Sequence, residues 1–227
     1  MLDLLPEDDP RAMRSRRDLR RINAWMLQGW IMRRLLATPA AQRPRTVLEL
    51  GGGDGTLMLK VARRMAPEWG DVTLLLLDRH DVVSSKTRDA FGTLGWKVES
   101  IVGDVFQVLL HPMERPIDLI VANLFLHHFQ PEQLTWLTER AAKLAPTFVA
   151  CEPRRGRLPL QACRMLWAIG CSDISRHDAL TSVRAGFCGK ELSALWPNRR
   201  NWVLDERAAG LFTHCFVARR RQEGGPA

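Results

Sequence analysis

The chain has 227 residues, of which 46% are hydrophobic, and a formal net charge of +8, so it is long enough for one domain with a substantial core. No stretch reaches the roughly 20 apolar residues of a membrane-spanning helix, and the acidic, then basic start "MLDLLPEDDPRAMRSRR" lacks the apolar centre of a signal peptide. The five cysteines are odd in number, widely spaced and without a C-x-x-C pair. This spacing favours free thiols in the cytoplasm over a disulfide framework or a zinc site.

The positive charge comes largely from arginines in the clusters "RSRRDLRR", "PRRGR" and "ARRRQ". Such a charge is consistent with a nucleic-acid partner or an anionic surface. Because the arginines are scattered over the whole chain, we favour a solvated basic surface and keep nucleic acid as the alternative.

The first 40 residues place apolar side chains, Trp25 and Trp30 among them, at helical spacing. This pattern predicts one or two amphipathic helices that end near Pro39 and Pro44. The two tryptophans would either close over a ligand or pack in the helical core, and both alternatives stay open. We expect residues 1–45 to form an N-terminal helical lid and residues 46–227 to form the main domain.

From residue 46 onward, short apolar runs alternate with helical segments. Strands are predicted over 46–50, 72–78, 96–104, 117–126 and 147–153, and helices over 56–66, 84–95 and 131–145. These intervals suit right-handed crossovers, so we expect an α/β fold with a parallel sheet that is covered on both faces.

The alternation of predicted strands and helices ends after Pro153. Residues 154–186 are rich in arginine and cysteine and are predicted to be helical around 158–170, as a cap inserted into the domain. A helix over 189–196 and two further strands, over 201–208 and 211–220, complete the prediction.

A glycine-rich turn, "LELGGGDGT", follows the first predicted strand, with four glycines in five positions. Strand, glycine turn and helix together let the backbone approach a ligand closely and offer it unpaired N–H groups. The dinucleotide fingerprint G-x-G-x-x-G would need a third glycine where the chain has Thr56, which counts against a nicotinamide oxidoreductase.

The observed spacing, Glu49-x-Gly51-x-Gly53-x-Gly55 with Gly52 between, resembles motif I of the class I S-adenosylmethionine-dependent methyltransferases. The resemblance implies S-adenosyl-L-methionine as cofactor. It also implies a Rossmann-like, seven-stranded, mainly parallel sheet in which the seventh strand lies between the fifth and the sixth.

Further cofactor contacts follow from the same resemblance. Asp78 ends the second strand, where the family has an acid for the ribose hydroxyls, and Arg79 follows it. Asp104 and Val105 would contact the adenine, although an N-cap is the alternative role of Asp104. Asn123 would lie beside the methionine part of the cofactor.

Two histidines are candidate general bases, since histidine is the usual base near neutral pH. His127, in "LHHF", lies just after the fourth strand, and simple packing of that turn is its alternative role. His177 lies in the cap segment. As a lid, that segment would present Met165, Trp167, Phe187 and several arginines to a hydrophobic substrate bearing a phenolate or carboxylate.

The sequence therefore predicts a cytoplasmic methyltransferase that acts on oxygen or carbon of a small, partly apolar molecule, such as a phenolic or polyketide-type secondary metabolite. An RNA methyltransferase is one alternative, weakened because "NLFL" stands where an N/D-P-P-[YFW] motif would be. A non-catalytic scaffold is the other. A homodimer is left open, and no metal ligands are predicted.

Overall fold

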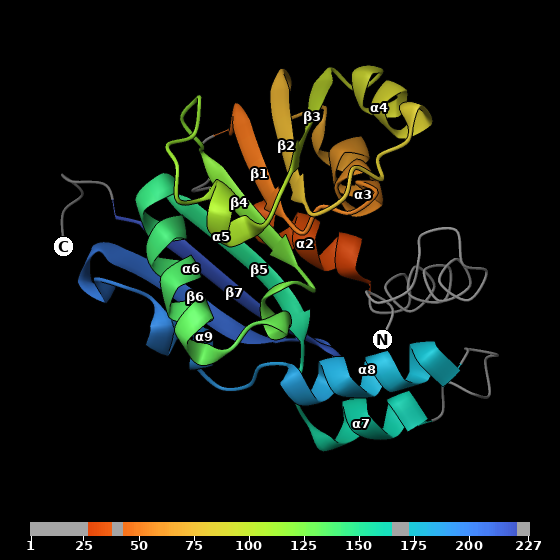
Figure 1. The fold of residues 1–227 in the computed structure, drawn as a ribbon, viewed down its shortest axis with the longest axis vertical. Helices are drawn as coiled ribbons and strands as arrows, with labels where there is room; N and C mark the ends of the chain where they lie inside the picture. Colours follow the sequence, from red (N-terminus) through yellow and green to blue (C-terminus); the bar gives the residue numbers. More distant parts are fainter. Residues whose placement is uncertain (1–26, 38–42, 165–172, 222–227) are drawn as a thin grey trace.

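The computed structural model describes residues 27–37, 43–164 and 173–221. Its centre is a seven-stranded sheet in the order β3-β2-β1-β4-β5-β7-β6 (Figure 1). Strands β1 to β5 are parallel, and β7 is antiparallel to both β5 and β6. The strands are β1 (Thr46–Leu50), β2 (Val72–Asp78), β3 (Trp96–Val102), β4 (Leu119–Asn123), β5 (Thr147–Pro153), β6 (Trp202–Ala209) and β7 (Thr213–Arg220).

Helices connect and cover these strands. They include α2 (Gln28–Leu36), α3 (Thr56–Met65), α4 (Ser85–Gly92), α5 (Val105–Val108), α6 (Pro131–Leu144), α7 (Arg157–Arg164), α8 (Asp173–Ala185) and α9 (Glu191–Leu195), with short 3₁₀ helices η2 (Leu126–His128) and η4 (Arg199–Asn201). Among the residues described, no helix combines the length and apolar character needed to cross a bilayer.

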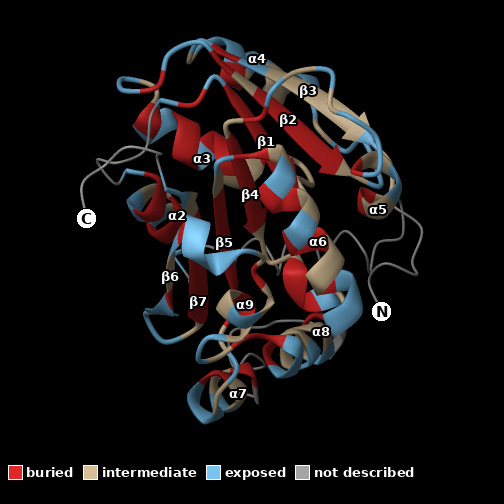
Figure 2. Cartoon of the chain, turned by 90° about the vertical axis from the view of Figure 1, so that its left-hand side faces the viewer, coloured by how far each residue is buried: buried red, intermediate tan, exposed pale blue. Residues whose placement is uncertain are grey.

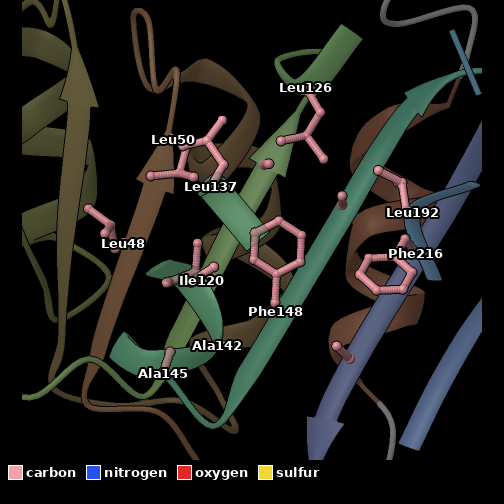
Figure 3. Close-up of a cluster of buried hydrophobic side chains, with 14 of the residues drawn as sticks. Leu48, Leu50, Ile120, Leu126, Leu137, Ala142, Ala145, Phe148, Leu192 and Phe216 are labelled. Carbon is pink, nitrogen blue, oxygen red and sulfur yellow. The ribbon is translucent and has the colours of Figure 1, made fainter. Parts of the chain in front are cut away.

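The core has two halves, one on each face of the sheet. Apolar strand residues alternate between the faces, and both sets are buried (Figure 2), as expected for a sheet covered by helices on both sides. One cluster packs Leu50, Ile120, Phe148 and Phe216 against Leu137 of α6 (Figure 3). The other cluster packs the opposite face of the sheet against α2 and α3.

The N-terminal and cap segments differ in how they pack. Within the predicted lid 1–45, α2 buries Ile31, Met32, Leu35 and Leu36 in the core, so this part is a layer of the domain. Trp25 lies outside the described residues. In the cap, α7 and α8 pack together at the end of the molecule toward which β5 points (Figure 1).

Two strands near the predicted site end earlier than the sequence predicts. The strand expected over 117–126 ends at Asn123, because Leu124 takes a left-handed conformation (φ +51°) that leaves the extended path, and η2 follows. The strand expected to reach residue 104 ends at Val102. Asp104 then accepts a hydrogen bond from the Phe106 N–H at 2.9 Å and begins α5, which was not predicted.

Candidate functional site

The turn after β1 is left-handed at Gly51 (φ +70°), Gly53 (φ +51°) and Gly55 (φ +71°). The Gly53 N–H donates to Asp78 Oδ2 at 2.9 Å, which ties the turn to the end of β2. A Cβ on Gly53 would meet nothing within 4 Å, whereas a Cβ on Gly51 would lie 2.4 Å from the ring of Phe125. The backbone at Gly53 is therefore open to a ligand, while the turn packs tightly at Gly51.

The next residues lead the turn into α3. The Gly55 N–H donates to the carbonyl of Gly52 at 3.0 Å, and the Thr56 N–H donates to Asp54 Oδ1 at 3.0 Å. A Cβ on Gly52 would lie 2.9 Å from the side chain of Leu76, so glycine is needed for the close approach to β2. These contacts hold the helix N-terminus beside the open backbone of the turn.

Two buried acceptors near the turn lack hydrogen bonds. Glu49 is 2% exposed, and neither its Oε2 nor Asn123 Oδ1 has a partner among the described residues. Burial, and then the charges of Asp54 and Asp78, raise the pKa of Glu49 well above its ordinary value. Glu49 pairs with Val121 in the β1–β4 register, which places Asn123 on the same face of the sheet. Since unpaired buried acceptors are costly, this pair suits a ligand that brings a donor or a cation.

The predicted contacts to ribose and adenine lie at the ends of β2 and β3. Asp78 accepts from the N–H of Gly53 and, at 3.2 Å, from that of His80. Arg79 is 70% exposed and donates to Asp104 Oδ2 at 2.8 Å. This bond, followed by the Phe106 N–H, lowers the pKa of Asp104. Asp104 thus has the N-cap role that was its alternative, and cofactor contact by Asp104, Arg79 and the buried Val105 stays a prediction.

His127 is 8% exposed, and its Nδ1 lies 2.8 Å from Oε2 of the fully buried Glu152 at the end of β5. Because a carboxylate only accepts, we assign the hydrogen to Nδ1, which leaves a lone pair on Nε2. The second carboxylate oxygen, Oε1, accepts the N–H groups of Phe125 at 3.0 Å and Leu126 at 2.8 Å. Glu152 therefore fixes both the histidine turn and the ring of His127.

Sequence reasoning missed the role of Glu152. The available signal was a carboxylate inside the apolar strand "TFVACEP", because a charge is buried there only with partners. Its partners are 25 to 27 positions away in the chain, so the pairing depends on the register of β4 and β5.

Two further histidines, His128 and His177, lie on elements that form or contact this turn. The ring of His128, which is exposed, lies 4.2 Å from that of His127 between centroids. His177 is exposed on α8, and α8 packs against η2, so the cap helix lies over the histidine turn. Phe187, expected to face the substrate, is instead buried in the core, whereas Met165 and Trp167 lie outside the described residues.

A family model described as "Methyltransferase domain" matches residues 47–147, from β1 to the start of β5. This segment contains the glycine turn, Asp78, Asp104 and His127. Residues 47–147 therefore form a class I S-adenosylmethionine-dependent methyltransferase domain. The prediction of family, enzyme class and cofactor is thereby confirmed, and the sheet order of the methyltransferase confirms the implied fold. A search of curated proteins gave no match.

Solved structures share the fold of the methyltransferase at low identity. A putative O-methyltransferase from Nostoc punctiforme PCC 73102 aligns with TM-score 0.59 and 13% identity over 85% of this chain and 56% of its own. An O-methyltransferase family protein from Burkholderia thailandensis aligns with TM-score 0.56 and 19% identity over 96% and 63%. The chain thus spans less than two thirds of either protein.

A third structure is similar over nearly its whole length. The O-methyltransferase TomG from Streptomyces achromogenes, which is involved in tomaymycin synthesis and was solved with S-adenosylmethionine, aligns with TM-score 0.53 and 14% identity over 97% of this chain and 93% of its own. In the chain described here, the open backbone at Gly53 and the unpaired oxygens of Glu49 and Asn123 fit this cofactor, which carries positive charge and donor groups.

Proposed function

We propose that the chain methylates an oxygen or carbon atom of a small, partly apolar molecule of phenolic or polyketide type, with His127 as general base. The pairing of His127 Nδ1 with Glu152 at 2.8 Å carries this proposal. It fixes one defined tautomer of a nearly buried histidine in η2, four residues after the predicted cofactor contact Asn123.

S-adenosylmethionine, when bound, supplies a methyl group on a positively charged sulfur. Glu49, Asn123 and the turn at Gly53 would hold its methionine part, and Asp78 its ribose. His127 Nε2 would take the proton of the acceptor hydroxyl or acidic carbon, which leaves on the acceptor the electron pair that receives the methyl group as the carbon–sulfur bond breaks and its electrons stay on sulfur. The imidazolium that results is stabilised by the carboxylate of Glu152, which also keeps the ring oriented.

Two observations support the substrate class. Aromatic side chains gather beside η2, with Phe129 in contact with Phe106 at 5.3 Å and with Phe125 at 4.9 Å between ring centroids. The structural neighbours named above are described as O-methyltransferases. We further propose that residues 154–186 cap the substrate and that residues 1–45 contribute to closing the site.

The proposal is tested by transfer of radiolabelled methyl groups to a panel of phenols and polyketide-type acceptors. His127→Gln should lower kcat by about 100- to 10,000-fold, the usual contribution of a general base, and leave adenosylhomocysteine binding unchanged in calorimetry. His128→Gln makes the same change one residue along, on an exposed ring, and should retain activity within a few-fold. Equal loss in both variants, or methylation of none of the panel by an adenosylhomocysteine-binding protein, would refute the proposal.

A further inference from the structure

A large groove lies at the opposite edge of the sheet from the glycine turn. It is a groove of about 1360 Å³ where β4 and β5 begin and where α6 and β7 end. Figure 1 shows β4 and β5 running away from this edge toward η2 and the cap helices. Since β5 has seven residues, the groove lies about 20 Å from the histidine turn. It is therefore separate from the cofactor site.

The groove is strongly basic. Six cations line it against two carboxylates: Arg43, Lys143, Arg200, Arg219, Arg220 and Arg221 against Asp118 and Glu139. Asp118 Oδ2 is already engaged, because it accepts the backbone N–H groups of Arg45 at 2.7 Å and Thr46 at 2.9 Å. With both carboxylates counted, the lining has a formal charge of +4.

Two of the arginines are held in place by neutral groups. Arg219 donates to the carbonyl of Leu35 at 3.1 Å, and Arg220 donates to the carbonyl of Ala142 and lies 5.1 Å from the centre of the Trp202 ring. Carbonyls and an aromatic face orient a guanidinium without cancelling its charge. The fold thus places oriented positive charge along the wall of the groove, which the carboxylate of Asp205 partly offsets at Arg219.

The residues that line the groove favour a nucleic acid over an acidic peptide as its partner. Peptides usually need apolar anchors, and the one aromatic side chain among the lining residues, Trp202, is 5% exposed and occupied by Arg220. A nucleic-acid backbone needs no such anchor, since it gains affinity from phosphate contacts and release of counterions. The buried tryptophan likewise offers no platform for base stacking, so sequence would be read weakly.

We propose that this groove binds the phosphate backbone of a nucleic acid, with little sequence preference, independently of methyl transfer. The predominance of arginine fits this role, because its planar fork binds phosphate oxygens in pairs. The partner is held at the amino edge of the sheet, while the carboxyl edge holds the cofactor.

The test is fluorescence anisotropy of a labelled 20-nucleotide single-stranded RNA with the full chain in the absence of cofactor, so that its outcome does not depend on the methyltransferase reaction. The groove variant is Lys143→Glu with Arg200→Glu, because both side chains are exposed and make no hydrogen bond or ion pair within the described part of the chain. The matched control is Arg63→Glu with Arg64→Glu on α3, which changes the net charge equally at exposed positions.

We expect the groove variant to bind at least tenfold more weakly and the control to stay within twofold to threefold of the wild type. The plot of log affinity against log salt should also become shallower by about 1.4, for two lost phosphate contacts. Should the groove variant unfold in a thermal scan, Arg43→Glu with Arg221→Glu replaces it.

Three outcomes would overturn the assignment. One is the absence of RNA binding by the wild type at 50 mM salt. Another is an equal loss of affinity in the groove and control variants, which would reduce the effect to overall charge. Competition by poly-glutamate as effective as by unlabelled RNA of the same charge would identify an acidic polypeptide as an equally good partner.

Discussion

The chain buries two glutamate–histidine pairs that are built alike. Glu152 and His127 meet at 2.8 Å, and so do Glu206 and His214. Each carboxylate also accepts backbone N–H groups of a short helix, η2 for Glu152 and α9 for Glu206. The pairs are neighbours, because Glu152 faces His214 directly in the β5–β7 register. Such a pair satisfies a buried carboxylate and holds a helix end in place.

The two pairs differ in the ring nitrogen that they use. His127 contacts its carboxylate through Nδ1, so its remaining nitrogen is Nε2 at the far tip of the ring. His214 contacts its carboxylate through Nε2, so its remaining nitrogen lies next to its own backbone. His127 is also more exposed, at 8% against 2%. A buried glutamate–histidine pair can therefore offer a base to a ligand or only stabilise the fold. The role depends on which ring nitrogen donates to the carboxylate.

The largest expected difference between the pairs is in catalysis. Glu152→Gln places an amide N–H₂ where the carboxylate accepted from His127 Nδ1, so we expect the tautomer to reverse and Nε2 to lose its lone pair. Turnover should then fall by about 100- to 10,000-fold, equivalent to about 3–5 kcal/mol. Glu206→Gln makes the same exchange in the other pair and should leave kcat within a few-fold. Equal kcat values in the two variants would show that the His127 tautomer does not matter.

A smaller effect is expected on folding. His214→Ala removes the side-chain partner of Glu206 and should lower the free energy of unfolding by about 2–3 kcal/mol in urea titrations, since a buried charge loses a hydrogen bond. Glu206 keeps its N–H partners in α9, at 3.0 Å from Leu192 and 2.7 Å from Ser193, which limits the loss. Because His214 is assigned no part in the chemistry, kcat at a temperature where the variant is folded should be retained. A loss of kcat without a loss of stability would contradict this division of roles.

The sequence predicted the glycine turn and most of the sheet because these depend on local patterns. The bounds of β1, β2 and β5 follow from apolar runs that end at a glycine turn, an aspartate and a proline. Glu152 and Glu206 could not be read in this way, because their partners lie on other strands and helices and depend on long-range register. In the cap, a helix was predicted only around residues 158–170, and α8 was missed. The packing of the cap against η2 brings α8 over the turn and Phe187 into the core.

The acid stability of the second pair provides a finer test. Burial alone would raise the pKa of Glu206, but the hydrogen bonds from His214, Ser193 and Leu192 together hold it below its ordinary value. A lowered pKa adds stability above the ordinary value of about 4.3, and this contribution is lost as pH falls through the folded value. We therefore expect unfolding free energies measured from pH 7 to pH 3 to fall less steeply for Glu206→Gln, by at most about 1.4 kcal/mol per pH unit. Parallel curves for variant and wild type would rule this out.

Glu49 is a third buried glutamate, and it differs from Glu152 and Glu206. It has neither a histidine nor an N–H partner among the described residues. Its pKa is raised, chiefly by burial, so its contribution to stability is complete below the ordinary value of about 4.3 and is lost as pH rises through the folded value. We expect cofactor-free Glu49→Gln to be nearly as stable as the wild type at pH 4 and more stable at pH 8, by about 1.4 kcal/mol for each unit by which burial raises the Glu49 pKa.

Cofactor binding should reverse the stability advantage that Glu49→Gln has over the wild type at pH 8. Since S-adenosylmethionine is cationic, it should favour the ionised form of Glu49, so the wild type should release a proton on binding and gain more thermal stability from the cofactor at pH 8 than at pH 6. Calorimetry in buffers of different ionisation enthalpy measures that proton directly. Glu49→Gln should release none, whereas Glu68→Gln, a change at an exposed glutamate, should behave as the wild type does. If proton release persists in Glu49→Gln, another group is responsible, and the unpaired carboxyl is not the one that meets the cofactor.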